Sequence, residues 1–142
     1  MIELMVMLGI FASVQNAAAP AAAPEPRQIA EDAMKFVVAN DMKGLFELIG
    51  RHMPMKAEEL ETIHTKTLEA RKVLPEQAGK VLGYAFISEC RRSDIFVQFT
   101  FVEKREKAAV RWQFLFYKPR NTWQMTYFFF DQDLKALFAS CA

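Results

Sequence analysis

The chain has 142 residues, of which 52% are hydrophobic and 25% are charged, as is usual for one globular domain. Its formal net charge of +1 provides no global field that would favour nucleic acid or an anionic membrane. The two cysteines, Cys90 and Cys141, belong to neither a CxxC pair nor a Cys/His cluster, which argues against a structural zinc site. We therefore expect no metal and no cofactor.

The beginning of the chain has the pattern of an export signal. Residues 4–14 (LMVMLGIFASV) are apolar, but a stable membrane span needs about 20 such residues. Small residues follow, and cleavage after Ala21 is preferred, so we predict a signal peptide over 1–21 and a secreted or periplasmic protein. Glu3 precedes the apolar run and no Lys or Arg does, which is untypical of a signal. A buried or fraying first helix is the alternative.

Residues 22–27 are expected to form an Ala/Pro linker and residues 28–142 a single domain. Helical spacing begins near Pro26, with Ile29, Ala33, Phe36 and Val37 on one side. A second, shorter helix follows Asp41, which is a suitable N-cap, and Gly50 is its predicted stop. The third helix covers AEELETIHTKTLEARKVL, and Pro75 and Gly79 close the helical half of the chain.

After Gly79 the hydrophobic period changes to two, which predicts four strands near residues 81–91, 95–103, 108–118 and 122–131. The breaks between them are short and polar, as in an antiparallel meander. Helices followed by such a sheet predict an α+β fold. The alternation predicts a helix-facing set made of Leu82, Tyr84, Phe86, Ile95, Val97, Phe99, Phe101, Val110, Trp112, Phe114, Phe116, Trp123, Met125, Tyr127 and Phe129.

The opposite face of the predicted sheet is more apolar than a face exposed to water requires. Of the 18 aromatic residues in the chain, 14 lie between Tyr84 and Phe130. The large apolar residues predicted on this face are Phe96, Val102, Leu115, Tyr117, Phe128 and Phe130. We expect a second covering layer or a surface that pairs with another molecule.

Three segments together resemble the NTF2-like (cystatin-like cone) superfamily over roughly residues 28–138. They are VVANDMKGLFELI at the junction of two helices, PEQAGKVLGYAFI at the entry to the first strand, and the terminal hairpin WQFLFYKPRNTWQMTYFFFD. The resemblance implies two or three helices packed on a curved four-stranded antiparallel meander, as in small exported members without assigned chemistry. Members bind small apolar ligands, catalyse isomerisation or hydration, or dimerise through the convex sheet. The carboxylate base and the Tyr/Asp pair of the isomerases have no matching positions here, so no catalytic residue is carried over.

Five residues are candidates for lining a pocket between helices and sheet: Tyr84, Trp112, Trp123, Tyr127 and His64. The aromatic rings could bury a ligand while their polar tips orient it. His64 follows Leu60 on the apolar side of the third helix and could act as a base near neutral pH. The alternative is that all five are ordinary packed side chains.

For several other polar residues, a structural role is an alternative to a functional one. Glu89 and Asp131 lie near strand ends, where a carboxylate is either solvated or, inside an aromatic cone, a proton shuttle. His52 is expected in an exposed loop. Because the first and third hairpin turns of a meander lie at the same end, Arg91, Arg92, Lys118 and Arg120 should make that end basic. A phosphate or an acidic partner could use this end, although solvated turn residues are the commoner explanation.

Whether the two cysteines form a disulfide depends on the compartment of the protein. In an exported chain Cys90 and Cys141 could form a disulfide that ties the tail to the sheet, and closing a loop of about 50 residues would contribute roughly 3 to 4 kcal/mol. In the cytoplasm they would remain free thiols.

The sequence favours an exported, non-catalytic binding or protein-interaction domain, because it lacks a catalytic set. We expect either a homodimer through the outer sheet face or a small apolar ligand, and no stable membrane span. A small-molecule isomerase or dehydratase that uses the cone cavity is the alternative, so enzymatic activity stays open. Basic and aromatic residues interleave as in single-strand nucleic-acid platforms, but exported proteins rarely meet that ligand, so we expect no nucleic-acid partner.

Overall fold

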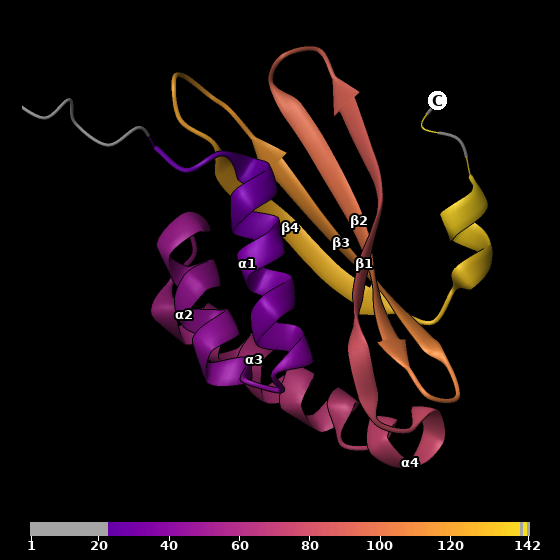
Figure 1. Ribbon diagram of the computed structural model, residues 1–142. Coiled ribbons are helices and arrows are strands. Elements are labelled where there is room, and N and C mark those ends of the chain that lie inside the picture. The colour runs from indigo at the N-terminus through magenta and orange to yellow at the C-terminus, as the bar shows by residue number, and fades with distance from the viewer. Residues whose placement is uncertain (1–22, 140, 142) are drawn as a thin grey trace, which may run out of the picture.

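The computed structural model describes residues 23–139 and 141, so the predicted signal peptide over 1–21 lies outside the described residues. Helices precede a four-stranded antiparallel sheet, which confirms the α+β prediction (Figure 1). The elements are α1 (Pro26–Val38), α2 (Met42–His52), α3 (Ala57–Arg71), α4 (Leu74–Ala78), β1 (Val81–Arg92), β2 (Phe96–Arg105), β3 (Ala109–Tyr117), β4 (Gln124–Asp131) and the 3-10 helix η1 (Leu134–Phe138).

Helices α1 and α2 begin as the sequence predicts. Pro26 is the first residue of α1, where its missing N–H costs no hydrogen bond. Asp41 caps α2, since its side chain accepts a hydrogen bond of 2.9 Å from the Gly44 backbone N–H. The predicted stop at Gly50 is wrong, because α2 continues to His52. Met53, just beyond the helix, is buried, and burying this side chain favours continuing the last helical turn.

The end of the helical half contains a short helix, α4, at a place where Pro75 and Gly79 predict only a boundary. Gly79 ends α4 with a φ of 79°, a backbone conformation that L side chains rarely adopt. A Cβ at this position would also lie 2.9 Å from Cβ of Glu106. Gly79 therefore allows the chain to turn closely past the β2–β3 hairpin before β1 begins.

The sheet is a meander with the strand order β1-β2-β3-β4. Helix α1 packs across β1 and β2, α2 reaches β4, and α3 packs against α2. The longer helices lie on one side of the sheet and η1 on the other (Figure 1). We call the helix-covered side the inner face and the opposite side the outer face. The inner face is aromatic and almost solvent-free, with Val97, Phe99, Phe101, Val110, Trp112, Phe114, Phe116 and Met125 at 0–1% exposure.

Two irregularities in the sheet overturn parts of the predicted inner face. Between Phe116↔Met125 and Leu115↔Tyr127 the β3–β4 register shifts, so Tyr127 and Phe129 lie on the outer face. Phe128 and Phe130 instead pack against the core. A second shift, between Val81 and Gly83 of β1, leaves Leu82 64% exposed. In both places an extra residue breaks the period of two, which alternation alone does not reveal.

Candidate functional site

The space between the helices and the sheet is filled with side chains. Trp112 lies in its middle, fully buried, with its ring stacked on Phe130 at 4.7 Å between ring centroids. The core also contains Leu45 and Ile49 of α2 and Met34 of α1, each at 0% exposure. Packing of this kind makes Trp112 a core residue rather than the wall of a ligand cavity.

The five pocket candidates are not brought together. Tyr84 is half-buried, edge-on to Phe101 at 6.0 Å. Trp123 lies beneath the Lys118 ammonium at 5.0 Å, beside a surface groove that His52 also lines. Tyr127 is 54% exposed on the outer face. His64 stacks on the Phe46 ring at 4.5 Å in a groove of about 530 Å³ between α2 and α3.

The sequence-predicted polar candidates are mostly surface groups. Arg111 binds Asp131 across the outer face, with 2.8 Å between Nε and Oδ1, and this hydrogen bond holds the pKa of Asp131 below its usual range. Glu89 lies 3.3 Å from Arg91 in an exposed ion pair. His52 is half-buried rather than fully exposed, and burial, aided by the charge of Arg51, lowers its pKa. None of these groups faces another candidate base.

Sequence reasoning missed the most buried charged group of the described chain. Glu103 at the end of β2 has 0% exposure and accepts hydrogen bonds of 2.9 Å from both Nη1 and Nη2 of Arg71. It also accepts from Nε of Arg105 at 2.9 Å and from Nε1 of Trp112 at 3.0 Å. Arg105 in turn donates to the Gly79 carbonyl at 2.7 Å. We call Arg71, Glu103, Arg105 and Trp112 the buried ion cluster.

The buried ion cluster keeps its carboxylate ionised. Burial alone raises the pKa of Glu103, but the hydrogen bonds and charges of Arg71 and Arg105, with the Trp112 hydrogen bond, outweigh burial and lower the pKa below its usual value. A carboxylate held in this way is a poor general base, because its lone pairs are already occupied. The signal was present in the sequence: Glu103 continues the alternation of Phe99 and Phe101, and Arg71 continues the inward spacing of α3.

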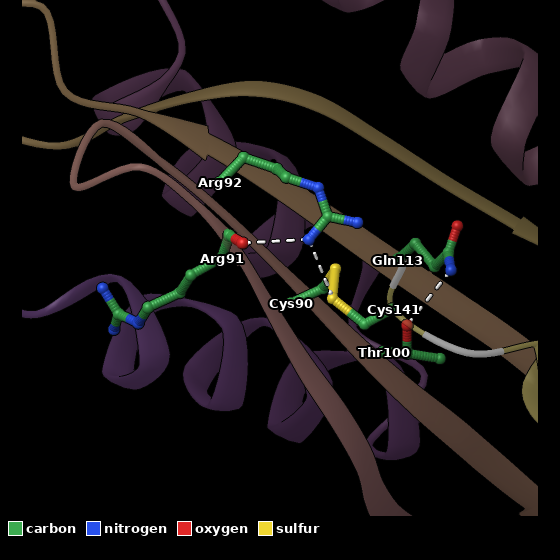
Figure 2. The surroundings of a disulfide bond; sticks show 6 residues. All are labelled: Cys90, Arg91, Arg92, Thr100, Gln113 and Cys141. Atoms are coloured by element: carbon green, nitrogen blue, oxygen red, sulfur yellow. Dashed lines mark hydrogen bonds between the residues drawn. A yellow bond between two sulfur atoms is a disulfide. The ribbon is translucent and has the colours of Figure 1, made fainter.

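The outer face is crossed by the end of the chain. A disulfide joins Cys90 of β1 to Cys141, with 5.6 Å between the Cα atoms. Figure 2 shows Arg92 beside this bond, with its Nη1 3.0 Å from the Arg91 carbonyl and 3.3 Å from Cys141 Sγ. Between η1 and the sheet lies a groove of about 360 Å³, whose floor includes Thr100 and Gln113, hydrogen-bonded at 3.1 Å.

Beyond the tail, the outer face carries apolar side chains. Phe96 stacks on Tyr117 at 5.0 Å, and Tyr127 lies 5.4 Å from Phe129. Leu115 pairs with Tyr127 between them. We call Phe96, Leu115, Tyr117, Tyr127 and Phe129 the outer aromatic patch. Arg111 and Asp131 neutralise each other across β3 and β4, whereas the exposed Arg92 beside Phe96 forms no ion pair with a described carboxylate.

Comparison of the chain with protein-family models, with curated proteins and with solved structures gives no match. In residues 23–139 and 141, no three His, Cys, Asp or Glu side chains are grouped as a metal site would require. No helix in the same residues is both long enough and apolar enough to cross a membrane.

Proposed function

We propose that this protein is an exported, non-catalytic interaction domain that pairs with a second copy of itself through the outer aromatic patch. The observation that carries the proposal is the patch itself, where Tyr127 keeps 54% of its surface exposed although it lies among four other apolar side chains. Exposed groups of this kind are typical of protein contacts. A relationship to NTF2-like proteins stays a prediction.

The packing of the interior supports the non-catalytic part. An isomerase or dehydratase would need an ionisable group in a water-accessible apolar cavity, but Trp112, Phe114 and Phe116 occupy the centre of the fold at 0% exposure. The carboxylate nearest to that centre, Glu103, is held by two guanidinium groups and an indole. The geometry of the interior therefore does not support the alternative of an isomerase or dehydratase.

The disulfide supports export. A bond between Cys90 and Cys141 persists in an oxidising compartment and is rarely kept in the cytosol. We expect the protein, expressed with its own amino terminus in an export-competent host, to begin at residue 22 after processing. Intact mass after thiol alkylation should show no modified cysteine without reductant and two with it. A retained, unprocessed chain that alkylates twice without reductant would count against export.

The charge pattern of the outer face supports a second copy as the occupant. In a two-fold symmetric dimer the same surface meets itself, so an unpaired charge close to the two-fold axis would face a like charge. Here Arg111 is neutralised by Asp131, and the neighbouring Gln113 and Thr100 are uncharged and bonded to each other. These groups therefore add no like charges to the contact, and the exposed Arg92 beside Phe96 has to lie away from the two-fold axis.

The test is sedimentation velocity over a concentration series. We expect the wild type to form a dimer and Tyr127→Asp to be monomeric, because the variant buries an unpaired carboxylate between two apolar faces. Val73→Asp is the matched control, since Val73 is also exposed, at 48%, but lies between α3 and α4. A monomeric wild type, or equal association of the wild type and Tyr127→Asp, would reject the proposed self-association.

A further inference from the structure

A second feature lies on the helix side of the molecule, apart from the outer aromatic patch. At the corner where α3, α4 and the start of β1 meet there is a pocket of about 560 Å³, a volume within the range of small-molecule sites. Met42, Leu68, Pro75 and Val81 contribute its apolar lining, and Arg71 and Arg105 of the buried ion cluster also line it. The pocket thus combines an apolar wall with two buried guanidinium groups.

The buried ion cluster carries more positive than negative charge. Arg71 and Arg105 supply two positive charges, and Glu103 supplies one negative charge. Within the described part of the chain, no other carboxylate lies within 4 Å of either guanidinium. Both arginine side chains are only 5% exposed, so the excess charge is poorly screened by solvent. An anion in the pocket would neutralise it.

Arg71 has hydrogen-bonding capacity left over. Two of its N–H groups, on Nη1 and Nη2, reach Glu103, but its buried Nε–H finds no acceptor among the described residues. Buried donors in folded proteins are nearly always satisfied. In the described part of the chain this is the one buried side-chain donor without an acceptor, and it belongs to a residue that lines the pocket. Because the Nε atom is closed off from solvent, an acceptor from the pocket reaches it only if the Arg71 side chain shifts.

The rim of the pocket is also basic. Lys72 and Lys80 line it; Lys72 is paired with Glu69 at 2.6 Å, whereas Lys80 forms no ion pair with a described carboxylate. Only the backbone N–H of Lys80 is engaged, by Glu106 at 2.9 Å. An approaching anion therefore meets the free ammonium of Lys80 before it reaches the buried guanidinium groups.

We propose that this pocket binds an amphipathic carboxylate, a molecule with an apolar body and one carboxylate head. The head lies beside Arg71 and Arg105, at the N–H groups that Glu103 and the Gly79 carbonyl leave unused, since a guanidinium group suits a carboxylate partner. The body packs on Met42, Leu68 and Val81. A hydrophobic amine would place a like charge beside the cluster, and a short acid would leave the apolar lining uncovered, so each should bind less tightly.

The test uses decanoate below its micelle-forming concentration, with decylamine and acetate as probes that each lack one feature. Isothermal titration calorimetry should detect saturable binding of decanoate alone. In a two-dimensional NMR spectrum, the Arg71 Nε–H resonance should shift with decanoate and stay in place with decylamine. Equal binding of decanoate and decylamine, or no binding of decanoate, would overturn the proposal.

Two surface variants locate the site without disturbing the buried ion cluster. Leu68→Asp, at a side chain that is 45% exposed, should weaken decanoate binding roughly tenfold or more by removing apolar contact and adding a like charge. Lys80→Glu should weaken it roughly threefold to tenfold. Lys66→Glu, at an exposed position of α3 outside the pocket, is the charge control. Decanoate binding unchanged by both Leu68→Asp and Lys80→Glu would place the ligand elsewhere and reject the assignment.

Discussion

Glu103 is surrounded by groups that favour its charged form, at a position where burial alone would favour the neutral form. Removing a carboxylate from water costs several kcal/mol, and close, well-oriented partners are needed to offset that cost. Arg71, Arg105 and Trp112 all lie within 3.0 Å of its oxygens. The cluster joins α3, β2 and β3, so it fixes how the third helix meets the sheet, while Leu68 and most other α3 residues remain exposed.

Replacing the Glu103 carboxylate tests whether its charge stabilises the fold. Glu103→Gln should lower the free energy of unfolding at pH 7 by about 3–5 kcal/mol, because it leaves two buried guanidinium groups without a counter-charge. The folded-state pKa of Glu103 is below its ordinary value of 4.5. The stabilisation by its charge is therefore complete above about that pH and is lost as the pH falls through the folded pKa.

Urea denaturation at several pH values measures this difference. The gap between wild type and Glu103→Gln should be widest near neutrality and should narrow below pH 4.5. Glu89→Gln is the control, because that carboxylate is 38% exposed and its loss should cost under about 1 kcal/mol. A gap that stays constant with pH would show that packing, rather than charge, explains the effect.

At the scale of elements, α2 contains two glycines whose replacement by alanine should change the stability of the protein in opposite directions. At Gly50 a Cβ would meet only the end of the Leu60 side chain, at 3.0 Å, beside an open groove. At Gly44 it would lie 2.5 Å from the Phe36 ring and 2.6 Å from the capping carboxylate of Asp41. Gly50→Ala should therefore stabilise the protein by about 0.5–1 kcal/mol. Gly44→Ala should destabilise it by about 1 kcal/mol through loss of the cap.

Thermal or chemical denaturation of the two variants provides the measurement, and each is the control for the other because both glycines lie in one helix. Intrinsic helix propensity alone predicts stabilisation by both changes. Equal stabilisation would therefore mean that the contacts around Gly44 relax without cost.

The sequence predicted the elements better than their register. Alternation placed Val97, Phe99, Phe101, Trp112, Phe114 and Phe116 on the buried face, and they lie there. It failed for Tyr127 because a bulge depends on the pairing of two strands and leaves no periodic mark in either. The pocket beside Arg71 was also missed. Its parts come from α2, α3, α4, β1 and β2, and residues distant in sequence meet there only after the chain folds.

At the scale of the whole molecule, the helices and the sheet share one core. Met34 of α1, Leu45 of α2 and Phe114 of β3 belong to the same cluster of buried side chains. Neither the helices nor the sheet can keep their apolar side chains buried without the other layer. We therefore expect one cooperative unfolding transition rather than separate melting of helices and sheet.

Two probes can test this expectation under oxidising conditions. Far-ultraviolet circular dichroism follows the helices. Tryptophan fluorescence follows Trp112, which is fully buried in the sheet core, together with the half-buried Trp123. Their denaturation midpoints should coincide. Loss of the helical signal at a clearly lower denaturant concentration would mean that the helices form a separate, weaker unit.

The bond between Cys90 and Cys141 also gives the chain the topology of a ring with one tail. The ring includes the end of β1 and all of β2, β3, β4 and η1, while α1 to α4 belong to the tail. One proteolytic cut within either of the last two hairpin loops opens the ring, but the two pieces stay covalently joined. A cut between α2 and α3 instead releases a helical fragment. On a non-reducing gel, a single cut inside the disulfide-closed loop thus leaves one covalently joined chain, whereas a single cut between α2 and α3 gives two separate fragments.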